Sequence, residues 1–372
     1  MIFNKPIIAI TGSAGKTMVK TLTSAVLRQK WEVFEPNHYN NTFQKTEEHA
    51  KKIDESHQAA VLEYGMAFAG ALTKHCDYIE PNISVITNVG LAHIENFDSD
   101  VRLLAKAKSE IIKGMKKTGK LYLNADDINS KLLETDGFKG EIITIGIDAD
   151  ADFRASNIEY LDTGIRFCVL LNEKTHIFFI PLFGRHNVYN ALFAIAVSHM
   201  LGFSPMDMRR ALKNIRRPEH RLDVIKLKNN ITIIDDTVHA NPVAVKAAID
   251  VLDQIAKHQK IVVLGSMSEL GEKSVYHHRK IGRYLKSKNV DYVFTHGNVS
   301  VDIGKGAMAD GFSKRRVSHK TRLKRNELFE ELIKTIRPGA TVLIKGFSRL
   351  KMSEIVDFLC NHYGFRNVGK GA

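Results

Sequence analysis

The segment Thr-Gly-Ser-Ala-Gly-Lys-Thr at positions 11–17 is the strongest chemical signal in the chain. It lies between a short apolar run, 6–10, and an amphipathic stretch, so it joins a predicted buried strand to a predicted helix. Glycines at such a junction let backbone N–H groups curl around phosphate oxygens at the helix N-terminus. The loop residues that would do so are Gly12, Ser13, Ala14 and Gly15.

The two residues after this loop complete a nucleotide site. Lys16 neutralises the β- and γ-phosphates, and the Thr17 hydroxyl is a ligand for Mg²⁺. The alternative interpretation is a glycine turn that happens to precede Lys-Thr. The strand before it and the helix after it favour nucleotide binding.

Two further predicted strands end in side chains of the kinds that bind metal ions. Glu63 follows the apolar run 59–62, and His93 follows the run 83–87 after a short polar loop. Ligands gather at the carboxyl ends of strands in open α/β sheets, so both side chains would face the phosphates. Each alone could be a solvated loop residue, but the pair favours a second divalent ion.

For two other segments, the spacing of residues does not decide between a functional and a purely structural role. The run Ala-Lys-Ala-Lys-Ser-Glu-Ile at 105–111 has the charge pattern of an exposed helix face, and its spacing gives no reason to reject that interpretation. Asp235 and Asp236 follow a predicted strand, but they are also suited to cap the helix that Pro242 opens. Glycine-containing loops after 261–264 and 341–344 favour a second ligand-binding rim, with a cleft between the two rims.

Alternating apolar runs and amphipathic stretches predict an α/β protein with a mostly parallel sheet in its first part. Predicted strands are 6–10, 32–34, 59–62, 83–87, 120–123 and 142–145, and predicted helices include 16–29 and 100–115. From residue 152 the alternating segments 164–171 and 175–181 predict antiparallel hairpins at the sheet edge, followed by helices 187–200 and 205–215.

Clustered charge and a proline at 216–220 predict a domain boundary, after which the βα alternation restarts. We therefore expect two domains, a central P-loop ATPase-like domain at 1–216 and a Rossmann-like α/β domain at 217–372. Predicted strands of the second domain are 231–234, 261–264, 292–294 and 341–344, and its predicted helices are 243–255, 276–287, 326–336 and 352–362.

Composition excludes a mainly disordered, collagen-like or disulfide-scaffold protein, because 44% of the 372 residues are hydrophobic and 26% are charged. The formal net charge is +13, with the densest basic run at 314–325. No aromatic residue interleaves with that run, which favours a solvated basic loop over nucleic-acid binding. Three scattered cysteines, no signal-like N-terminus and no long apolar run predict a cytoplasmic protein without membrane contact.

The motifs taken together resemble the Mur ligase family, ATP-dependent amide-forming enzymes, most closely the branch that adds D-alanyl-D-alanine to a peptidoglycan precursor. The resemblance covers essentially the whole chain. Its ordered motifs are 11–17, 37–41, 62–65, 88–93, 105–111, 124–127, 184–191, 220–222, 235–242, 264–271 and 345–349.

The resemblance implies roles for individual residues. The phosphate loop and Thr17 would hold ATP and a first Mg²⁺, shared with Glu63, and His93 would help to hold a second Mg²⁺. Lys108 falls on the family's carbamylated lysine, which reverses the exposed-face interpretation of its helix. Further nucleotide contacts would come from His186, Asn187 and Asn190 on the adenine side and from Arg221, Asp236 and His239 of the second domain.

The implied reaction begins when a substrate carboxylate attacks the γ-phosphate of ATP and forms an acyl phosphate. An amino acid or dipeptide amine then displaces phosphate and forms an amide. Lys16, the two Mg²⁺ ions and Arg221 would neutralise the crowded oxyanions, and domain closure would exclude water.

The sequence also departs from the family pattern. The phosphate-loop strand begins at Pro6, which leaves no room for the N-terminal domain that grips the UDP-sugar, so we expect either a partner protein or a different carboxylate substrate. Ser109, Ser266 and His239 replace the glycine, aspartate and asparagine of the nearest branch. Alternatives are a truncated D-alanyl-D-alanine-adding enzyme and an ATP-binding regulatory or scaffold subunit without turnover.

Overall fold

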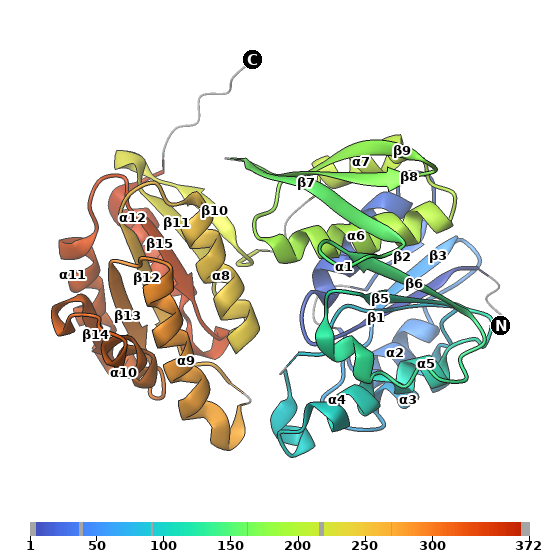
Figure 1. The fold of residues 1–372 in the computed structure, drawn as a ribbon, viewed down its shortest axis with the longest axis horizontal. Helices are drawn as coiled ribbons and strands as arrows, with labels where there is room; N and C mark the ends of the chain where they lie inside the picture. Colours follow the sequence, from blue (N-terminus) through green and yellow to red (C-terminus); the bar gives the residue numbers. More distant parts are fainter. Residues whose placement is uncertain are drawn as a thin grey trace. The chain divides into compact units, whose positions relative to one another are not determined.

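The computed structural model describes residues 5–36, 40–90, 92–161, 163–215, 219–268 and 270–365 (Figure 1). The chain divides into two compact units, Met1–Arg216 and Arg217–Ala372. Residues 216–218 of the predicted boundary and residues 37–39 of the motif at 37–41 lie outside the described residues.

The first unit is built on one large sheet with the strand order β2-β3-β1-β4-β5-β6-β7-β8-β9. Strands β2 to β7 pair in parallel, and β8 and β9 extend the sheet in antiparallel fashion. The predicted mostly parallel sheet with edge hairpins is confirmed. The strands are β1 (Ile7–Thr11), β2 (Val33–Phe34), β3 (Ala59–Glu63), β4 (Ile83–Ile86), β5 (Lys120–Asn124), β6 (Glu141–Gly146), β7 (Phe153–Leu161), β8 (Gly164–Leu171) and β9 (Lys174–Ile180).

Helices cover both faces of this sheet. On β1, Ile8 and Ile10 join one apolar cluster with α1, α6 and α7, whereas Ile7 and Ala9 join another with α3, α4 and α5. The described helices of the unit are α1 (Lys16–Leu27), α2 (Phe43–Ala50), α3 (Ala71–Tyr78), α4 (Val101–Lys108), α5 (Glu110–Gly114), α6 (Arg185–Met200) and α7 (Pro205–Lys213), with short 3₁₀ helices at Ile94–Phe97 and Ile128–Leu132.

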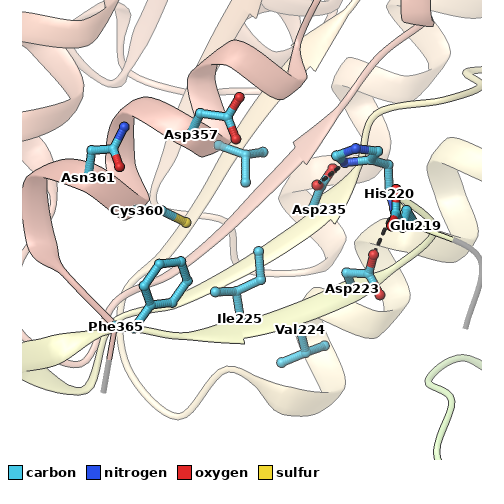
Figure 2. Close-up of a pocket in the computed structure, with 11 residues that line it drawn as sticks. Glu219, His220, Asp223, Val224, Ile225, Asp235, Asp357, Cys360, Asn361 and Phe365 are labelled. Atoms are coloured by element: carbon cyan, nitrogen blue, oxygen red, sulfur yellow. Dashed lines mark hydrogen bonds and ion pairs between the residues drawn. The ribbon is translucent and has the colours of Figure 1, made fainter. Parts of the chain in front are cut away.

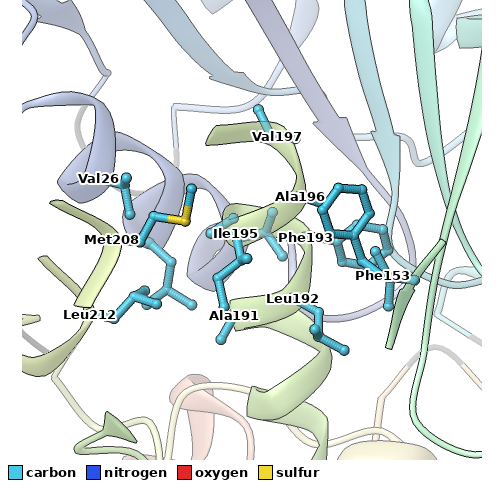
Figure 3. Packing of buried hydrophobic residues seen from close by; sticks show 14 of the residues in the cluster. Val26, Phe153, Ala191, Leu192, Phe193, Ile195, Ala196, Val197, Met208 and Leu212 are labelled. Carbon is cyan, nitrogen blue, oxygen red and sulfur yellow. The ribbon is translucent and has the colours of Figure 1, made fainter. Parts of the chain in front are cut away.

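Helix α6 is the central helix of the first cluster. Its residues from Ala191 to Val197 are all buried, so the middle of the helix has no solvent face and lies between α1, α7 and the sheet (Figure 3). Val26 of α1 and Met208 of α7 belong to the same cluster. Because α6 is apolar on every side, packing rather than amphipathicity determines its position.

The single helix predicted for residues 100–115 is wrong. The structure has two helices, α4 and α5, with a break at Ser109. The Ser109 hydroxyl donates to the carbonyl of Ala105 at 2.8 Å and accepts from the backbone N–H of Glu134 at 2.9 Å. A serine that bonds back to the preceding turn and outward to a loop disturbs the regular helix, and the break comes directly after Lys108.

The second unit contains a six-stranded sheet with the order β10-β11-β15-β12-β13-β14, parallel except for β10. Its strands are β10 (Asp223–Lys226), β11 (Thr232–Asp236), β12 (Lys260–Gly265), β13 (Tyr292–His296), β14 (Val317–Lys320) and β15 (Thr341–Lys345). Its helices are α8 (Pro242–Ile255), α9 (Ser274–Ser287), α10 (Val301–Ala309), α11 (Arg325–Thr335) and α12 (Ser353–Tyr363), with short 3₁₀ helices at Lys228–Asn230, Gly271–Lys273, Lys314–Arg316, Arg322–Lys324 and Ser348–Leu350.

Two details of this unit correct the sequence predictions. Asn241, not Asp235 or Asp236, caps α8, because its side chain accepts from the backbone N–H of Ala244 at 2.8 Å. The predicted basic loop contains an edge strand, β14, whose Lys320 pairs with Glu331 of α11 at 2.7 Å. Part of the positive charge is therefore neutralised within the unit.

No helix in the described part of the chain is both long enough and apolar enough to cross a bilayer.

The sequence pattern did not predict helix α10, because this helix contains Gly304 and Gly306 and glycine is a poor helix former. A Cβ at Gly306 would lie 2.2 Å from the carbonyl oxygen of Arg279, so the glycine permits close packing against α9.

The burial of α6 gives a stability prediction. We expect Leu192→Ala, at a fully buried position, to lower the free energy of unfolding by about 2–5 kcal/mol because it leaves a cavity. Leu170→Ala is the matched control, because Leu170 is 59% exposed and its truncation should cost less than about 1 kcal/mol. Urea unfolding of both variants measures the difference, and equal losses would contradict this packing.

Candidate functional site

The loop between β1 and α1 approaches its neighbours too closely for side chains. Gly12 has φ 140° and Gly15 has φ 86°, in the region that favours glycine. A Cβ at Gly12 would lie 2.0 Å from Oγ1 of Thr87, and one at Gly15 would lie 2.5 Å from Oδ1 of Asn190. The two glycines are therefore required by the packing of this loop as well as by its turn.

Residues after β4 fix the shape of the loop. Asn88 accepts from Ala14 N–H through its side-chain oxygen at 3.1 Å and donates back to the Ala14 carbonyl at 3.0 Å. Thr87 donates to the same carbonyl at 2.6 Å, and Ser13 Oγ accepts from Gly90 N–H at 2.9 Å. Gly15, the N-cap of α1, provides no side-chain cap. The first turn of α1 thus keeps N–H groups for an anion.

Lys16, Thr17 and Glu63 lie together beside this loop. The Lys16 amine donates to the Gly12 carbonyl at 2.8 Å, and Thr17 Oγ1 donates to Glu63 Oε2 at 2.9 Å. Burial opposes ionisation of Glu63, but the nearby Lys16 charge and hydrogen bonds from Asn41 and Thr17 lower its pKa. A hydroxyl and a carboxylate side by side form the oxygen donor set that Mg²⁺ prefers.

Two residues that organise this region, Asn41 and Asp127, have no individual role in the sequence predictions. Asn41 donates to Glu63 Oε1 at 2.9 Å, so both oxygens of that carboxylate are oriented. Asp127 accepts from Val89 N–H and from Ser130 Oγ, both at 2.7 Å, and so holds the segment after β4. Both residues lie within motifs of the family resemblance, at 37–41 and 124–127, which was the available signal.

His93 follows β4 as Glu63 ends β3, and both strands flank β1. His93 has a left-handed backbone, φ 61°, and precedes the 3₁₀ helix Ile94–Phe97. In the described part of the chain, no group of three or more His, Cys, Asp or Glu side chains is arranged to hold a metal. Mg²⁺ needs only one or two protein ligands when phosphate and water supply the others, so Thr17 and Glu63 suit it.

Lys108 is buried, which is unusual for a lysine. It ends α4 and is only 1% exposed, and among the described residues its amine has no hydrogen-bond or ion-pair partner. Burial and, to a smaller extent, the positive charge of Lys16 lower the pKa of Lys108, Asp127 opposes the shift, and the net pKa is about 7. Burial therefore favours the neutral form of the Lys108 amine far more than in an exposed lysine.

The start of α6 reaches the phosphate loop through Asn190, which lies against Gly15. Asn187 Nδ2 donates to the Phe183 carbonyl at 2.8 Å, and Asn190 Nδ2 donates to Asn187 Oδ1 at 2.9 Å. His186 is half-buried one residue earlier. The predicted adenine-side residues and the predicted phosphate loop are thus neighbours.

In the second unit, a pocket of about 750 Å³ lies beside β10, β11 and α12 (Figure 2). His220 lines it and contacts the Asp235 carboxylate at 2.6 Å through Nδ1. That hydrogen bond raises the pKa of His220, and burial raises the pKa of Asp235. The next residue, Arg221, is half-buried and forms no hydrogen bond or ion pair within the described ranges.

Asp236 is engaged within its own unit. Its Oδ2 accepts from the buried amine of Lys345 at 2.6 Å, and the same amine donates to the His239 carbonyl at 2.7 Å. His239 itself is exposed, with its ring 5.9 Å from that of Phe347. Lys345 therefore ties the ends of β11 and β15 together and places Asp236 and His239 at one rim.

Comparison with known proteins identifies both units. Residues 10–198 match the Mur ligase middle domain, and residues 220–347 match the domain described as Mur ligase, glutamate ligase domain. The chain is 32% identical to the UDP-N-acetylmuramoyl-tripeptide–D-alanyl-D-alanine ligase of Bacillus subtilis (strain 168), over 94% of this chain and 75% of that protein. Identity to the Escherichia coli (strain K12) enzyme of that name is 29%, over 94% and 76%.

Solved structures agree with this assignment. MurF from Acinetobacter baumannii superposes with a TM-score of 0.86 at 26% identity, over 96% of this chain and 76% of that one. The ADP complex of Thermotoga maritima MurF ligase gives a TM-score of 0.84 at 21% identity, over 97% and 81%, and supports the fold. The middle-domain match alone covers more than half of the chain, and the predicted family is confirmed: this chain belongs to the Mur ligase family of ATP-dependent peptide ligases.

Proposed function

We propose that the chain joins the carboxylate of a UDP-N-acetylmuramoyl-tripeptide to the amine of D-alanyl-D-alanine at the expense of ATP. The observation that carries this proposal is the arrangement of Lys16, Thr17 and Glu63 around the glycine loop, beside the buried Lys108. The substrate pair is taken from the curated relatives, which carry that pair in their names. A partner protein that grips the carboxylate substrate and the cytoplasmic location remain predictions.

The described residues fit ATP and Mg²⁺. The loop backbone and Lys16 would hold the phosphates, Asn187 and Asn190 of α6 would lie on the adenine side, and Thr17 and Glu63 would hold Mg²⁺. Bound Mg²⁺ would neutralise phosphate oxygens as negative charge develops on them. Glu63 suits this role because its lowered pKa keeps it ionised at neutral pH.

Lys16 and Arg221 would stabilise the transferred phosphoryl group. The Lys16 amine donates to the Gly12 carbonyl at 2.8 Å, so this hydrogen bond already holds the positive charge beside the loop before any substrate binds. Such preorganised charges stabilise a phosphoryl-transfer transition state without the cost of reorienting solvent. Catalysis in this site would therefore come mainly from positioning and electrostatics.

Lys108 would act as a carbamate. A neutral amine attacks CO₂, and burial supplies the neutral amine by lowering the Lys108 pKa to about 7. The amine nitrogen bonds to the carbon of CO₂ and releases one proton, so the product, a carbamate, would place a negative charge near Lys16 where the neutral amine stood. That carboxylate, with His93, would hold the second Mg²⁺.

Substrate use has a direct test. Incubation with ATP, Mg²⁺, the UDP-muramoyl tripeptide and D-alanyl-D-alanine should yield the pentapeptide product by mass spectrometry, with phosphate release that requires both acceptor and amine. ATP turnover that ignores both substrates would contradict the proposal. Binding of ATP without any turnover would instead favour a regulatory or scaffold subunit.

The pairing of Thr17 with Glu63 predicts the effect of removing either group. We expect Thr17→Val and Glu63→Gln to lower kcat/KM for ATP by roughly 10²-fold or more, because each removes an oxygen ligand for Mg²⁺. Thr21→Val is the matched control, one turn further along α1, where the hydroxyl only bonds the Thr17 carbonyl. Phosphate-release kinetics across an Mg²⁺ titration measure the effect, and comparable losses in all three variants would refute the assignment.

The Lys108 carbamate predicts a pH-dependent response to bicarbonate. The neutral amine increases as pH rises through about 7, so added bicarbonate should stimulate a CO₂-depleted enzyme more at about pH 8 than at about pH 6. Lys108→Ala should abolish both activity and stimulation, whereas Lys106→Ala, at an exposed lysine of the same helix, should retain both. A wild-type enzyme indifferent to CO₂ depletion at every pH would contradict the carbamate.

A further inference from the structure

His75 of α3 is fully buried, and both nitrogens of its ring have hydrogen-bond partners. Nδ1 lies 2.6 Å from the Thr46 hydroxyl of α2, and Nε2 lies 3.0 Å from the Gly65 carbonyl, in the segment after β3. Helices α2 and α3 pack against each other in the first unit (Figure 1). The ring therefore joins two helices to the segment that follows Glu63.

The two partners of His75 determine which nitrogen carries the proton. A carbonyl oxygen can only accept, so Nε2 donates to Gly65, and in a neutral ring Nδ1 then accepts from the Thr46 hydroxyl. Burial lowers the pKa of His75, hydrogen bonding to the Gly65 and Asn41 carbonyls opposes the shift, and the net pKa is about 4. The ring is therefore neutral at neutral pH, and only this tautomer satisfies both partners.

Aromatic packing fixes the orientation of the His75 ring. Tyr64 stacks on it with ring centroids 4.5 Å apart and an angle of 15° between the planes. Phe43 of α2 meets the ring edge-on, with centroids 6.5 Å apart. The Tyr64 hydroxyl donates to the Ile79 carbonyl at 2.7 Å, so the stacking partner is itself held. Because packing and two hydrogen bonds hold the imidazole, it is a rigid support for its partners.

Gly65 connects His75 to Asn41. Its carbonyl accepts from His75, and its N–H donates to the Asn41 carbonyl at 2.8 Å. A Cβ at Gly65 would lie 2.6 Å from the Asn41 carbonyl oxygen, so the absence of a side chain permits this approach. The Asn41 side chain in turn donates to Glu63 Oε1 at 2.9 Å. The contacts therefore run from α2 and α3 to one oxygen of the Glu63 carboxylate.

The orientation of the Glu63 carboxylate matters because Mg²⁺ requires nearly regular octahedral ligands. Groups that orient a metal ligand affect metal affinity although they do not touch the metal. We propose that His75 is a positioning residue that holds Gly65 and Asn41, so that Glu63 presents its carboxylate to Mg²⁺ in one orientation. The inference rests on the Mg²⁺ role proposed for Glu63.

Binding of nucleotide by the full chain tests the inference without turnover. The readout is the Kd of a non-hydrolysable ATP analogue with Mg²⁺, measured by calorimetry. His75→Ala should weaken binding roughly tenfold, as expected when a group that orients a metal ligand is lost. Full affinity in His75→Ala would overturn the inference.

Two further variants separate positioning from general stability. His75→Gln should recover most of the affinity, because its amide can donate to the Gly65 carbonyl and accept from Thr46. Cys76→Ala is the matched control, because Cys76 is the next residue of α3, is also buried and packs against Gly114 of α5. It should keep the wild-type Kd within about twofold. A loss in Cys76→Ala equal to that in His75→Ala, or no recovery in His75→Gln, would contradict positioning.

A double-mutant cycle with Asn41→Ala tests the route of the effect. If His75 acts through Asn41, then Asn41→Ala and the double variant should bind the analogue equally, within about twofold. Losses that multiply in the double variant would overturn the inference. If His75→Ala does not fold, Thr46→Val replaces it in the same cycle, because valine keeps the size of threonine and removes the hydroxyl that donates to the ring.

The same measurements distinguish this inference from the proposed ligase activity. If Asn41→Ala leaves the Kd unchanged, the link from His75 to Glu63 carries no effect and the positioning role falls. Formation of the amide product by the wild-type chain would then still support the ligase function. Absence of that product, with the nonadditive cycle intact, would support the positioning role and refute the function.

Discussion

The close approach of the glycine loop to its neighbours is the constraint on which the rest of the first unit depends. Side chains at Gly12 or Gly15 would collide with Thr87 or Asn190, so the loop, the exit of β4 and the start of α6 fit only in this arrangement. That arrangement positions Lys16 and Thr17 at the start of α1. It also explains why the middle of α6 is buried on all sides, since the start of the helix must reach the loop while its middle fills the core.

Two ionisable side chains of the site, Glu63 and Lys108, have their pKa values lowered by different causes. Glu63 stays ionised although buried, because a lysine and two hydrogen-bond donors outweigh the cost of burial. Lys108 is the reverse case, since burial and the charge of Lys16 favour its neutral form. One buried carboxylate with a lowered pKa and one buried lysine with a lowered pKa thus lie near the same Lys16, an arrangement consistent with the proposed ATP and Mg²⁺ site.

The phosphate loop and the strand and helix on either side of it could be predicted from the sequence, because their patterns are local. The fully buried β1, the glycine loop and the start of α1 follow one another, and their chemistry was predicted from that order. Asn41 and Asp127 were missed because their partners, Glu63 and Val89, are far away in the sequence. The helix break at Ser109 depends on a hydrogen bond from the backbone N–H of Glu134, which is distant in sequence. Asn241 caps α8, whereas the two carboxylates predicted as alternatives bond elsewhere: Asp235 contacts His220 and Asp236 accepts from Lys345.

Under the proposed function, this chain activates a carboxylate by phosphorylation, and transfer of an oxygen label tests that step. The substrate carboxylate is labelled with ¹⁸O, and inorganic phosphate is analysed by mass spectrometry after turnover with ATP and the amine. We expect one ¹⁸O atom in each phosphate released, because the bridging oxygen of the acyl phosphate comes from the carboxylate. Phosphate without ¹⁸O would show that water, not the substrate carboxylate, attacks the γ-phosphate, and would contradict the proposed function.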